Sequence, residues 1–216
     1  MGEIFREIDE ELRQDKFDKL WRAYGRYVIA GAVAIVIAVA GVNFWQQYQE
    51  TRRLEDGARF SAAKELFEDG KTDDAAALFA ALGRESGTSY GTLARFHEAA
   101  LSARKGDADA AVRLYEALTA ESGIDAPLRD LATILSASIQ ANDRSPDAEA
   151  IAARLQPLID GGGTWRHSAR EILATLKHRS GDIAAATLLF KNIVDDIEAP
   201  PGVRARAAQM LAIIGD

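Results

Sequence analysis

The chain has 216 residues, no cysteine and a formal net charge of -7. An acidic chain without a polybasic run lacks the surface that phosphate backbones require, which argues against a nucleic-acid-binding protein. The absence of cysteine excludes disulfides and thiolate chemistry, and plentiful alanine with few prolines or aromatics predicts an all-α fold.

The residues before the long apolar run, 1–26, are predicted to form an amphipathic tail, because Phe5, Ile8 and Leu12 recur at helical spacing. This apolar face is expected to rest on a lipid surface, and a partner protein is the alternative. Lysine and arginine occur at similar density on both sides of the apolar run. Charges in a short tail orient a helix more than those in a long domain, which predicts a cytoplasmic N-terminus and places residues 50–216 outside the cytoplasm.

Residues 27–49 form a long segment without a charged side chain. As a helix rising 1.5 Å per residue it would measure about 34 Å, enough to cross a hydrocarbon core of about 30 Å. Aromatic residues flank the run on both sides, where the two lipid headgroup layers would lie. They are Trp21, Tyr24 and Tyr27 before it, and Phe44, Trp45 and Tyr48 at its other end. We therefore predict a single transmembrane helix over 27–49.

Two other interpretations of this segment compete with the membrane anchor, a cleaved signal peptide and a buried core helix. Ala38, Val39 and Ala40 match the small-x-small pattern of a cleavage site, but a long charged region precedes the run and the run continues to Trp45. A core helix of a soluble domain rarely stays uncharged over such a length. These observations favour the anchor.

Beyond residue 50 a short pattern recurs, in which glycine is followed by alanine five positions later and by an aromatic residue nine positions later. Its copies are Gly70, Ala75 and Phe79; Gly106, Ala111 and Tyr115; and Gly181, Ala186 and Phe190. A weaker copy places Ala150, Leu155 and Leu158 at the matching positions. Glycine can end one helix in the left-handed conformation, alanine lets two helices approach closely, and the aromatic ring fills the space between them.

The residues that follow each glycine are expected to cap a second helix, since their side-chain oxygens can accept from free backbone N–H groups. The expected caps are Asp107, Asp182, Thr72–Asp73 and, in the weaker copy, Ser145 with Pro146 at the first helical position. Each unit is thus a hairpin with an apolar face, and stacking buries that face. We predict hairpins at about 54–84, 89–121, 127–160 and 165–197, with a capping helix at about 201–214.

No combination of residues predicts an enzyme active site, a metal or a cofactor. His167 and His178 would lie three turns apart on one helix and cannot share a metal, and His97 is far from both in sequence. The glycines at 161–163 lack the following lysine and the preceding strand of a phosphate-binding loop. The chain is therefore not expected to be an enzyme.

Five basic side chains are candidates for binding a partner, because they occur in the first helices of the second and fourth hairpins, which line the concave face of such a solenoid. They are Arg95, His97, Arg166, His167 and Arg170. A peptide carboxylate or an acidic segment is the expected ligand. Solvation of an exposed helix face is the alternative interpretation of the same residues.

The glycine, aspartate, alanine and aromatic positions resemble the second half of a tetratricopeptide repeat, although the first helices lack that repeat's tryptophan, leucine-glycine and tyrosine pattern. The charged tail, single anchor and four hairpins together resemble the bacterial inner-membrane family that includes the ancillary subunit of the Sec translocon (YfgM-type). The stretches "PLRDLA" and "WRHSARE" look like its alphaproteobacterial members. This resemblance implies a non-catalytic periplasmic scaffold that binds translocon subunits and envelope chaperones.

Two alternatives to this function stay open. An adaptor for cell-division, peptidoglycan or respiratory complexes would have the same sequence pattern, and only its partners would differ. An enzyme built from scattered carboxylates and histidines would instead have a closed pocket with strongly shifted pKa values, whereas a scaffold has an open groove.

Overall fold

The computed structural model describes the backbone of residues 2–215, and side chains at positions 24, 27, 29–31 and 33–215. The described residues form helices joined by short turns, without a strand, so the all-α prediction is confirmed. The helices are α1 (Gly2–Glu68), α2 (Thr72–Glu85), α3 (Ser89–Arg104), α4 (Ala108–Thr119), α5 (Ala126–Ala141), α6 (Ala148–Asp160), α7 (Arg166–Arg179), α8 (Ile183–Val194) and α9 (Pro201–Gly215). The chain divides into two units, Met1–Leu54 and Glu55–Asp216, and each is described by itself.

The first unit is the helical segment that carries the apolar run. The large apolar side chains that are described in it are exposed, and Ile35, Val36 and Ile37 are each 66% exposed. Among the described residues, one helix is long and apolar enough to cross a membrane, and its apolar window is not buried. This exposure argues against a buried core helix and fits either a membrane span or a signal sequence. The predicted tail face of Phe5, Ile8 and Leu12 lies outside the residues whose side chains are described.

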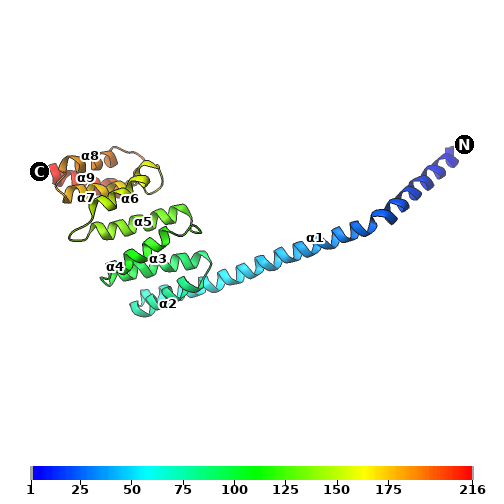
Figure 1. Cartoon of the computed structure of the whole chain (residues 1–216), viewed down its shortest axis with the longest axis horizontal. Helices are drawn as coiled ribbons and strands as arrows, with labels where there is room; N and C mark the ends of the chain where they lie inside the picture. The colour runs from blue at the N-terminus through cyan, green and yellow to red at the C-terminus, as the bar shows by residue number, and fades with distance from the viewer. Residues whose placement is uncertain (1, 216) are drawn as a thin grey trace. The chain divides into compact units, whose positions relative to one another are not determined.

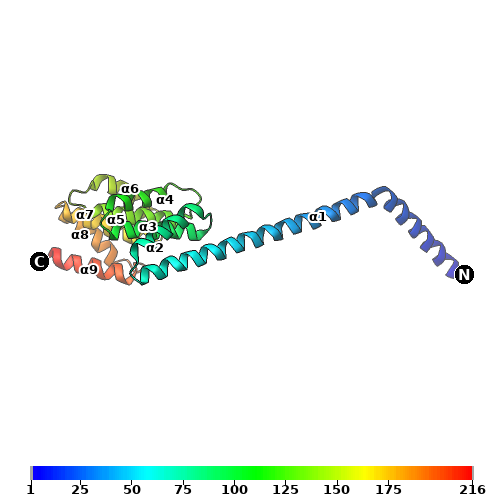
Figure 2. The same ribbon diagram turned by 90° about the horizontal axis from the view of Figure 1, so that it is seen from below.

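The second unit is a stack of antiparallel helix hairpins, as Figures 1 and 2 show. Residues 55–68 of α1 pack against α2 in one apolar cluster. The pairs α3–α4, α5–α6 and α7–α8 follow in order. The last helix, α9, packs against α8 and α7 and closes the stack. The predicted α-solenoid of four hairpins with a capping helix is therefore confirmed, with helix ends within a few residues of those expected from the sequence.

Three of the four hairpins turn at a glycine in the left-handed conformation. The φ angles are +80° at Gly70, +88° at Gly106 and +84° at Gly181, values that side chains with a Cβ rarely adopt. The next residue then caps the second helix in two cases: Asp107 accepts from the N–H of Ala110 at 3.0 Å, and Asp182, two hairpins later, accepts from the N–H of Ala185 at 3.2 Å. These caps are as predicted.

Two predicted caps are wrong. The residue before α2 is Lys71, whose side chain does not cap the helix, and Thr72 and Asp73 lie inside the helix. The negative charge of Asp73 in the first turn still interacts favourably with the positive end of the helix dipole. In the third hairpin Asp147 is the cap, accepting from the N–H of Ala150 at 3.0 Å, so Ser145 and Pro146 precede the helix. In the other hairpins the fourth residue after the cap is a buried alanine. Counted from Asp147 this residue is Ile151, which is buried, and Ala150, which the sequence pattern predicts to be buried, is exposed.

The core is a row of four apolar clusters, one at each junction between consecutive hairpins or helices. Each second helix contributes its fourth, eighth and eleventh residue after the cap, a spacing that keeps three side chains on one helical face. These residues are Ala75, Phe79 and Leu82 in α2; Ala111, Tyr115 and Leu118 in α4; Ile151, Leu155 and Leu158 in α6; and Ala186, Phe190 and Ile193 in α8. Because each cluster is shared between neighbours, the hairpins depend on stacking for burial.

Candidate functional site

Two of the predicted binding residues, Arg95 and His97, extend from α3 but make contacts within the stack. The guanidinium of Arg95 pairs with Glu121 at the end of the same hairpin. Its aliphatic stem packs over Gly83, where an added Cβ would come within 2.6 Å of Arg95 Cγ. The ring of His97 stacks on Phe79, with 4.7 Å between centroids. Both side chains are therefore part of the junction between the first and second hairpins.

Electrostatics at His97 follow from this packing. Burial between aromatic rings is the main cause that lowers the pKa of His97 below its ordinary 6.5, and the positive charge of Lys64 adds to it. The ring of Phe60 meets the imidazole edge-on at 5.3 Å, so α1, α2 and α3 all contribute to its surroundings. A neutral imidazole in this place acts as a packing group.

The remaining predicted binding residues lie on α7, and one of them is buried. His167 is only 2% exposed, and its Nε2 lies 2.8 Å from Asp196 Oδ2, so it joins α7 to the loop after α8 instead of facing a ligand. This hydrogen bond is the main cause that lowers the pKa of Asp196. Arg166 donates to Glu198 at 2.5 Å. Arg170 is half-exposed and makes no hydrogen bond or ion pair within the described residues.

The structure does not bring these five residues into one pocket. Arg95 and His97 belong to the second hairpin and the other three to the fourth, with the third hairpin between them in the stack. No contact recorded between described residues joins the two groups. Arg170 is consequently the member of the set whose charge is available to a partner.

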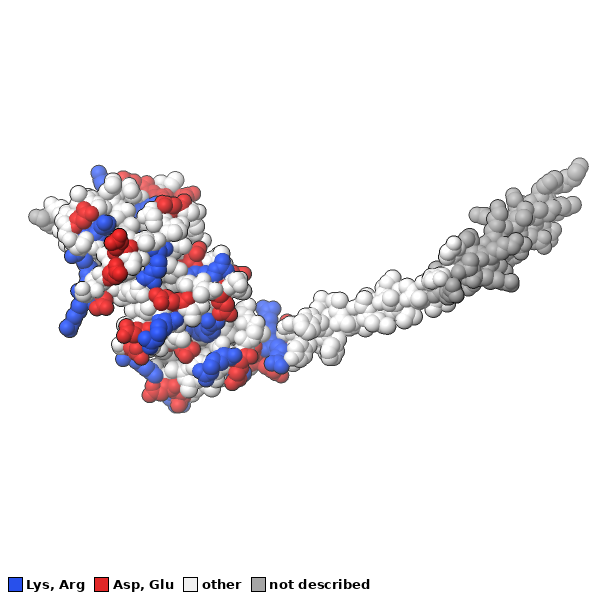
Figure 3. Space-filling view, in the orientation of Figure 1, with Lys and Arg blue, Asp and Glu red and all other residues white. Residues whose placement is uncertain are grey.

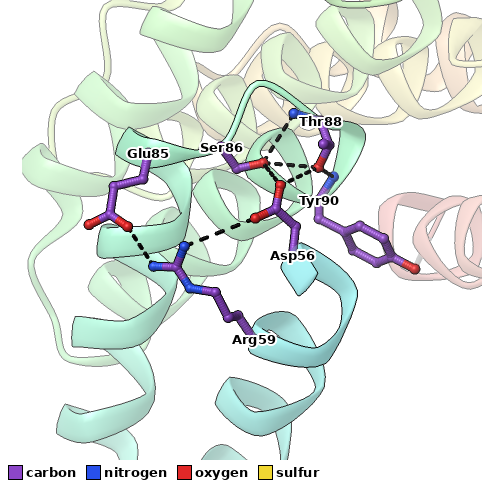
Figure 4. Close-up of polar contacts among 6 residues, drawn as sticks. All are labelled: Asp56, Arg59, Glu85, Ser86, Thr88 and Tyr90. Atoms are coloured by element: carbon purple, nitrogen blue, oxygen red, sulfur yellow. Dashed lines mark hydrogen bonds and ion pairs between the residues drawn. The ribbon is translucent and has the colours of Figure 1, made fainter. Parts of the chain in front are cut away.

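A buried polar cluster that sequence reasoning missed connects α1 to the α2–α3 loop (Figure 4). Asp56, 7% exposed, accepts from the hydroxyl of Ser86 at 2.5 Å and from that of Thr88 at 2.9 Å. Ser86 and Thr88 also contact each other at 2.9 Å, and Arg59 lies beside the carboxylate at 4.0 Å while donating to Glu85 at 2.6 Å. The cluster holds the loop against α1.

The surface of the second unit carries both signs of charge. Figure 3 shows lysine and arginine interspersed with aspartate and glutamate over the visible face, without a large area of one sign. Many of these charges are paired between elements, as in Lys105 with Asp73 and Arg206 with Glu171. Such a surface favours solubility and specific contacts over binding to a polyanion.

The described residues of the second unit line hollows that are partly open to solvent. One of about 360 Å³ lies between α6 and α7 and is largely apolar, with Ala152, Leu173 and Leu176 in its lining. Another of about 260 Å³ is polar and lies among α4, α5 and α6. The described residues contain no group of three or more histidines, aspartates or glutamates placed to hold a metal ion.

Comparison with known proteins agrees with this architecture. The family described as tetratricopeptide repeat-like domain matches residues 18–186, which is more than half of the chain. No curated protein and no solved structure matches it.

Proposed function

This chain belongs to the tetratricopeptide repeat-like domain family, and from that membership we propose that it is a membrane-anchored adaptor that holds partner proteins together at one site. The observation that carries the proposal is that the buried polar side chains bond to one another within the stack. His167, Arg95 and Asp56 serve contacts within the stack, and the outer surface of mixed charge stays open. A scaffold of this kind acts by raising the effective concentration of its partners.

The proposed topology assigns residues 27–49 to the membrane, 1–26 to a cytoplasmic tail and 50–216 to the periplasm of a bacterial inner-membrane protein. The exposed apolar side chains described in the first unit support the span, and the greater weight of charges in a short tail than in a long domain supports the orientation. A lone cysteine tests it, because the chain has none of its own. Ser145 suits the purpose, since it is exposed in the α5–α6 loop, whereas Ser86 is bonded to Asp56.

In cells with a permeabilised outer membrane, Ser145→Cys should react with a membrane-impermeant maleimide before lysis, and Gln14→Cys should react only after lysis. The opposite pattern would overturn the orientation. Recovery of the Ser145→Cys chain from the soluble fraction, shortened at its N-terminus, would identify the apolar run as a cleaved signal sequence instead.

The partners proposed from the resemblance are translocon subunits and periplasmic chaperones, which would place the chain on the path of exported proteins. Extraction in mild detergent, affinity capture of the full chain and mass spectrometry test this assignment. Enrichment of translocon subunits over a control membrane protein of similar abundance is expected. Enrichment of cell-division or respiratory subunits in their place would assign the adaptor to those complexes.

We further propose that Arg170 contacts an acidic segment of a partner, because its guanidinium is left without a counter-ion in the stack while Arg166 is paired. Arg170→Glu should reduce recovery of the partner, with a helix content equal to wild type. Arg113→Glu is the matched control, an exposed arginine on α4 that makes no recorded contact. Equal loss of capture in both variants would show a general charge effect and remove Arg170 from the interface.

A further inference from the structure

The hydroxyl of Ser136 on α5 is buried without a hydrogen-bond partner among the described residues. Four other helical hydroxyls donate to the carbonyl four residues earlier, and one of the four is also on α5. They are those of Ser102, Thr133, Thr175 and Thr187. Ser136 is only 1% exposed, so its O–H donor and its lone pairs are both withheld from bulk water. Native structures rarely leave such a group unpaired, and its presence calls for a ligand or a bound water.

Packing between hairpins does not require a hydroxyl at this position. The buried alanines Ala99 in α3 and Ala174 in α7 match the alanine that follows Ser136 in α5. The residues equivalent to Ser136 are therefore Glu98 and Leu173, one charged and one apolar. The repeat tolerates very different side chains here, so the hydroxyl is a feature of the third hairpin alone.

The space beside Ser136 is also specific to the third hairpin. At the preceding junction the stem of Arg95 covers Gly83. One repeat later, the equivalent positions hold Thr133 on α5 and Thr119 on α4, and these shorter side chains leave a hollow of about 260 Å³. This is below the roughly 300–1,000 Å³ of pockets that enclose whole small molecules, and it suits a single side chain.

The lining of this hollow is polar but nearly neutral. It consists of Glu116 and Thr119 on α4, Thr133 and Ser136 on α5, and Arg154 on α6. The Nη1 of Arg154 lies 2.9 Å from Glu116 Oε1, so these two charges balance. Thr119 and Thr133 donate to helix carbonyls and keep lone pairs free. The hollow thus offers one free O–H donor and several acceptors.

We propose that this hollow, named here the α4–α6 groove, receives the side-chain carboxamide of an asparagine or glutamine from a partner protein. The carboxamide oxygen would accept from the Ser136 hydroxyl. Its NH2 group would donate to Oε2 of Glu116, since Oε1 already accepts from Arg154 and from Gln140. A carboxylate would instead be repelled by Glu116, and an ammonium group would compete with Arg154 for it. The inference rests on the proposed adaptor function, and it specifies one contact between the adaptor and a partner protein.

Fragment binding to the full chain in lipid nanodiscs tests the groove without knowledge of the partner. Propionamide, propionate and butanone have similar size and differ in charge and in hydrogen-bond donors. With 13C-labelled threonine methyls observed by NMR, propionamide should produce saturable shifts at Thr119 and Thr133, which line the groove. Thr187 on α8 lies outside it and should not shift. Propionate and butanone should bind at least several-fold more weakly.

The variant Ser136→Ala removes the hydroxyl and should weaken propionamide binding by about 2- to 12-fold, the effect of one neutral hydrogen bond. The variant should melt at or above the wild-type temperature, because it removes an unpaired buried group. No saturable shift with propionamide, equal shifts with all three compounds, or unchanged affinity in Ser136→Ala would overturn the proposal. A Ser136→Ala melting temperature well below wild type would do the same, since it would show that an ordered water satisfies the hydroxyl.

Failure of the groove and failure of the adaptor function are distinguishable. If wild type captures its partners but propionamide does not bind, the carboxamide contact is wrong and the adaptor stands. If propionamide binds as described but capture yields no partner above the control, the groove exists and the adaptor function is wrong.

Discussion

Replacing Asp56 by alanine should release the α2–α3 loop from α1. In the folded protein the Asp56 carboxylate accepts from the hydroxyls of Ser86 and Thr88, which lie just after α2 and just before α3. The side chain is nearly buried, so water cannot replace the lost oxygen in place. The first hairpin and the second would then be joined by their apolar cluster, the stack of His97 on Phe79 and the Lys105–Asp73 ion pair.

The magnitude follows from these contacts. A hydrogen bond to a charged group contributes about 1.5–3 kcal/mol to stability, and two such bonds set an upper limit of about 6 kcal/mol. The two hydroxyls already contact each other at 2.9 Å and can partly satisfy one another after the change. Part of the carboxylate's own desolvation cost is also recovered. We therefore expect Asp56→Ala to lower the free energy of unfolding by about 2–4 kcal/mol.

Urea unfolding of the full chain in detergent, followed by circular dichroism at 222 nm, measures this change. Glu55→Ala is the matched control, because Glu55 precedes Asp56 and is exposed without a recorded contact. Hydrogen exchange should accelerate in α2 and at the start of α3 and stay unchanged in α8, since neighbouring repeats couple mainly to each other. A destabilisation equal to that of Glu55→Ala, or uniform acceleration in all helices, would refute the reasoning.

Three further changes have defined outcomes. The pKa of His97 in the folded chain lies below its ordinary 6.5, so the unfolded chain binds the proton first as the pH falls. The free energy of unfolding should therefore decrease as pH drops from about 7 toward the folded pKa. His97→Phe should remove this pH dependence of the melting temperature. Gly106→Ala should cost about 1 kcal/mol at a φ of +88°, measured by urea unfolding against Gly87→Ala, a loop glycine with open space and no positive φ. His167→Leu keeps the volume but leaves Asp196 without its donor, so the pKa of Asp196 measured by NMR should rise toward 3.8; an unchanged value would show that the backbone N–H bond alone lowers it.

The hairpins could be predicted from the sequence because their determinants are local. Glycine after a first helix, aspartate at the next cap and an aromatic residue on the buried face all act within one turn of helix or one hairpin. The third hairpin shows the limit of this approach. It lacks the turn glycine, so the sequence pattern predicts a cap at Ser145, whereas the cap is Asp147. The pattern likewise predicts a buried Ala150, whereas the buried residue is Ile151.

The polar contacts could not be predicted, because each joins residues far apart in sequence. Asp56 meets Thr88 across 32 positions, and His167 meets Asp196 across 29. A sequence pattern gives the helical face of such a residue but not the loop that packs over it. Ser136 left no signal at all, since a serine in a helix is ordinary until its neighbours are seen to leave it unpaired.

The ion pairs Arg59–Glu85 and Arg95–Glu121 bear on how this solenoid arose. Each joins residues 26 positions apart, and the second pair has the same place in its hairpin as the first. Chance seldom reproduces both a pair and its register, so the two hairpins are best understood as products of one duplication that kept its interface chemistry. The third hairpin, with Thr133 at the arginine position, has departed from that ancestor, and such departures are where a copied module acquires a role of its own.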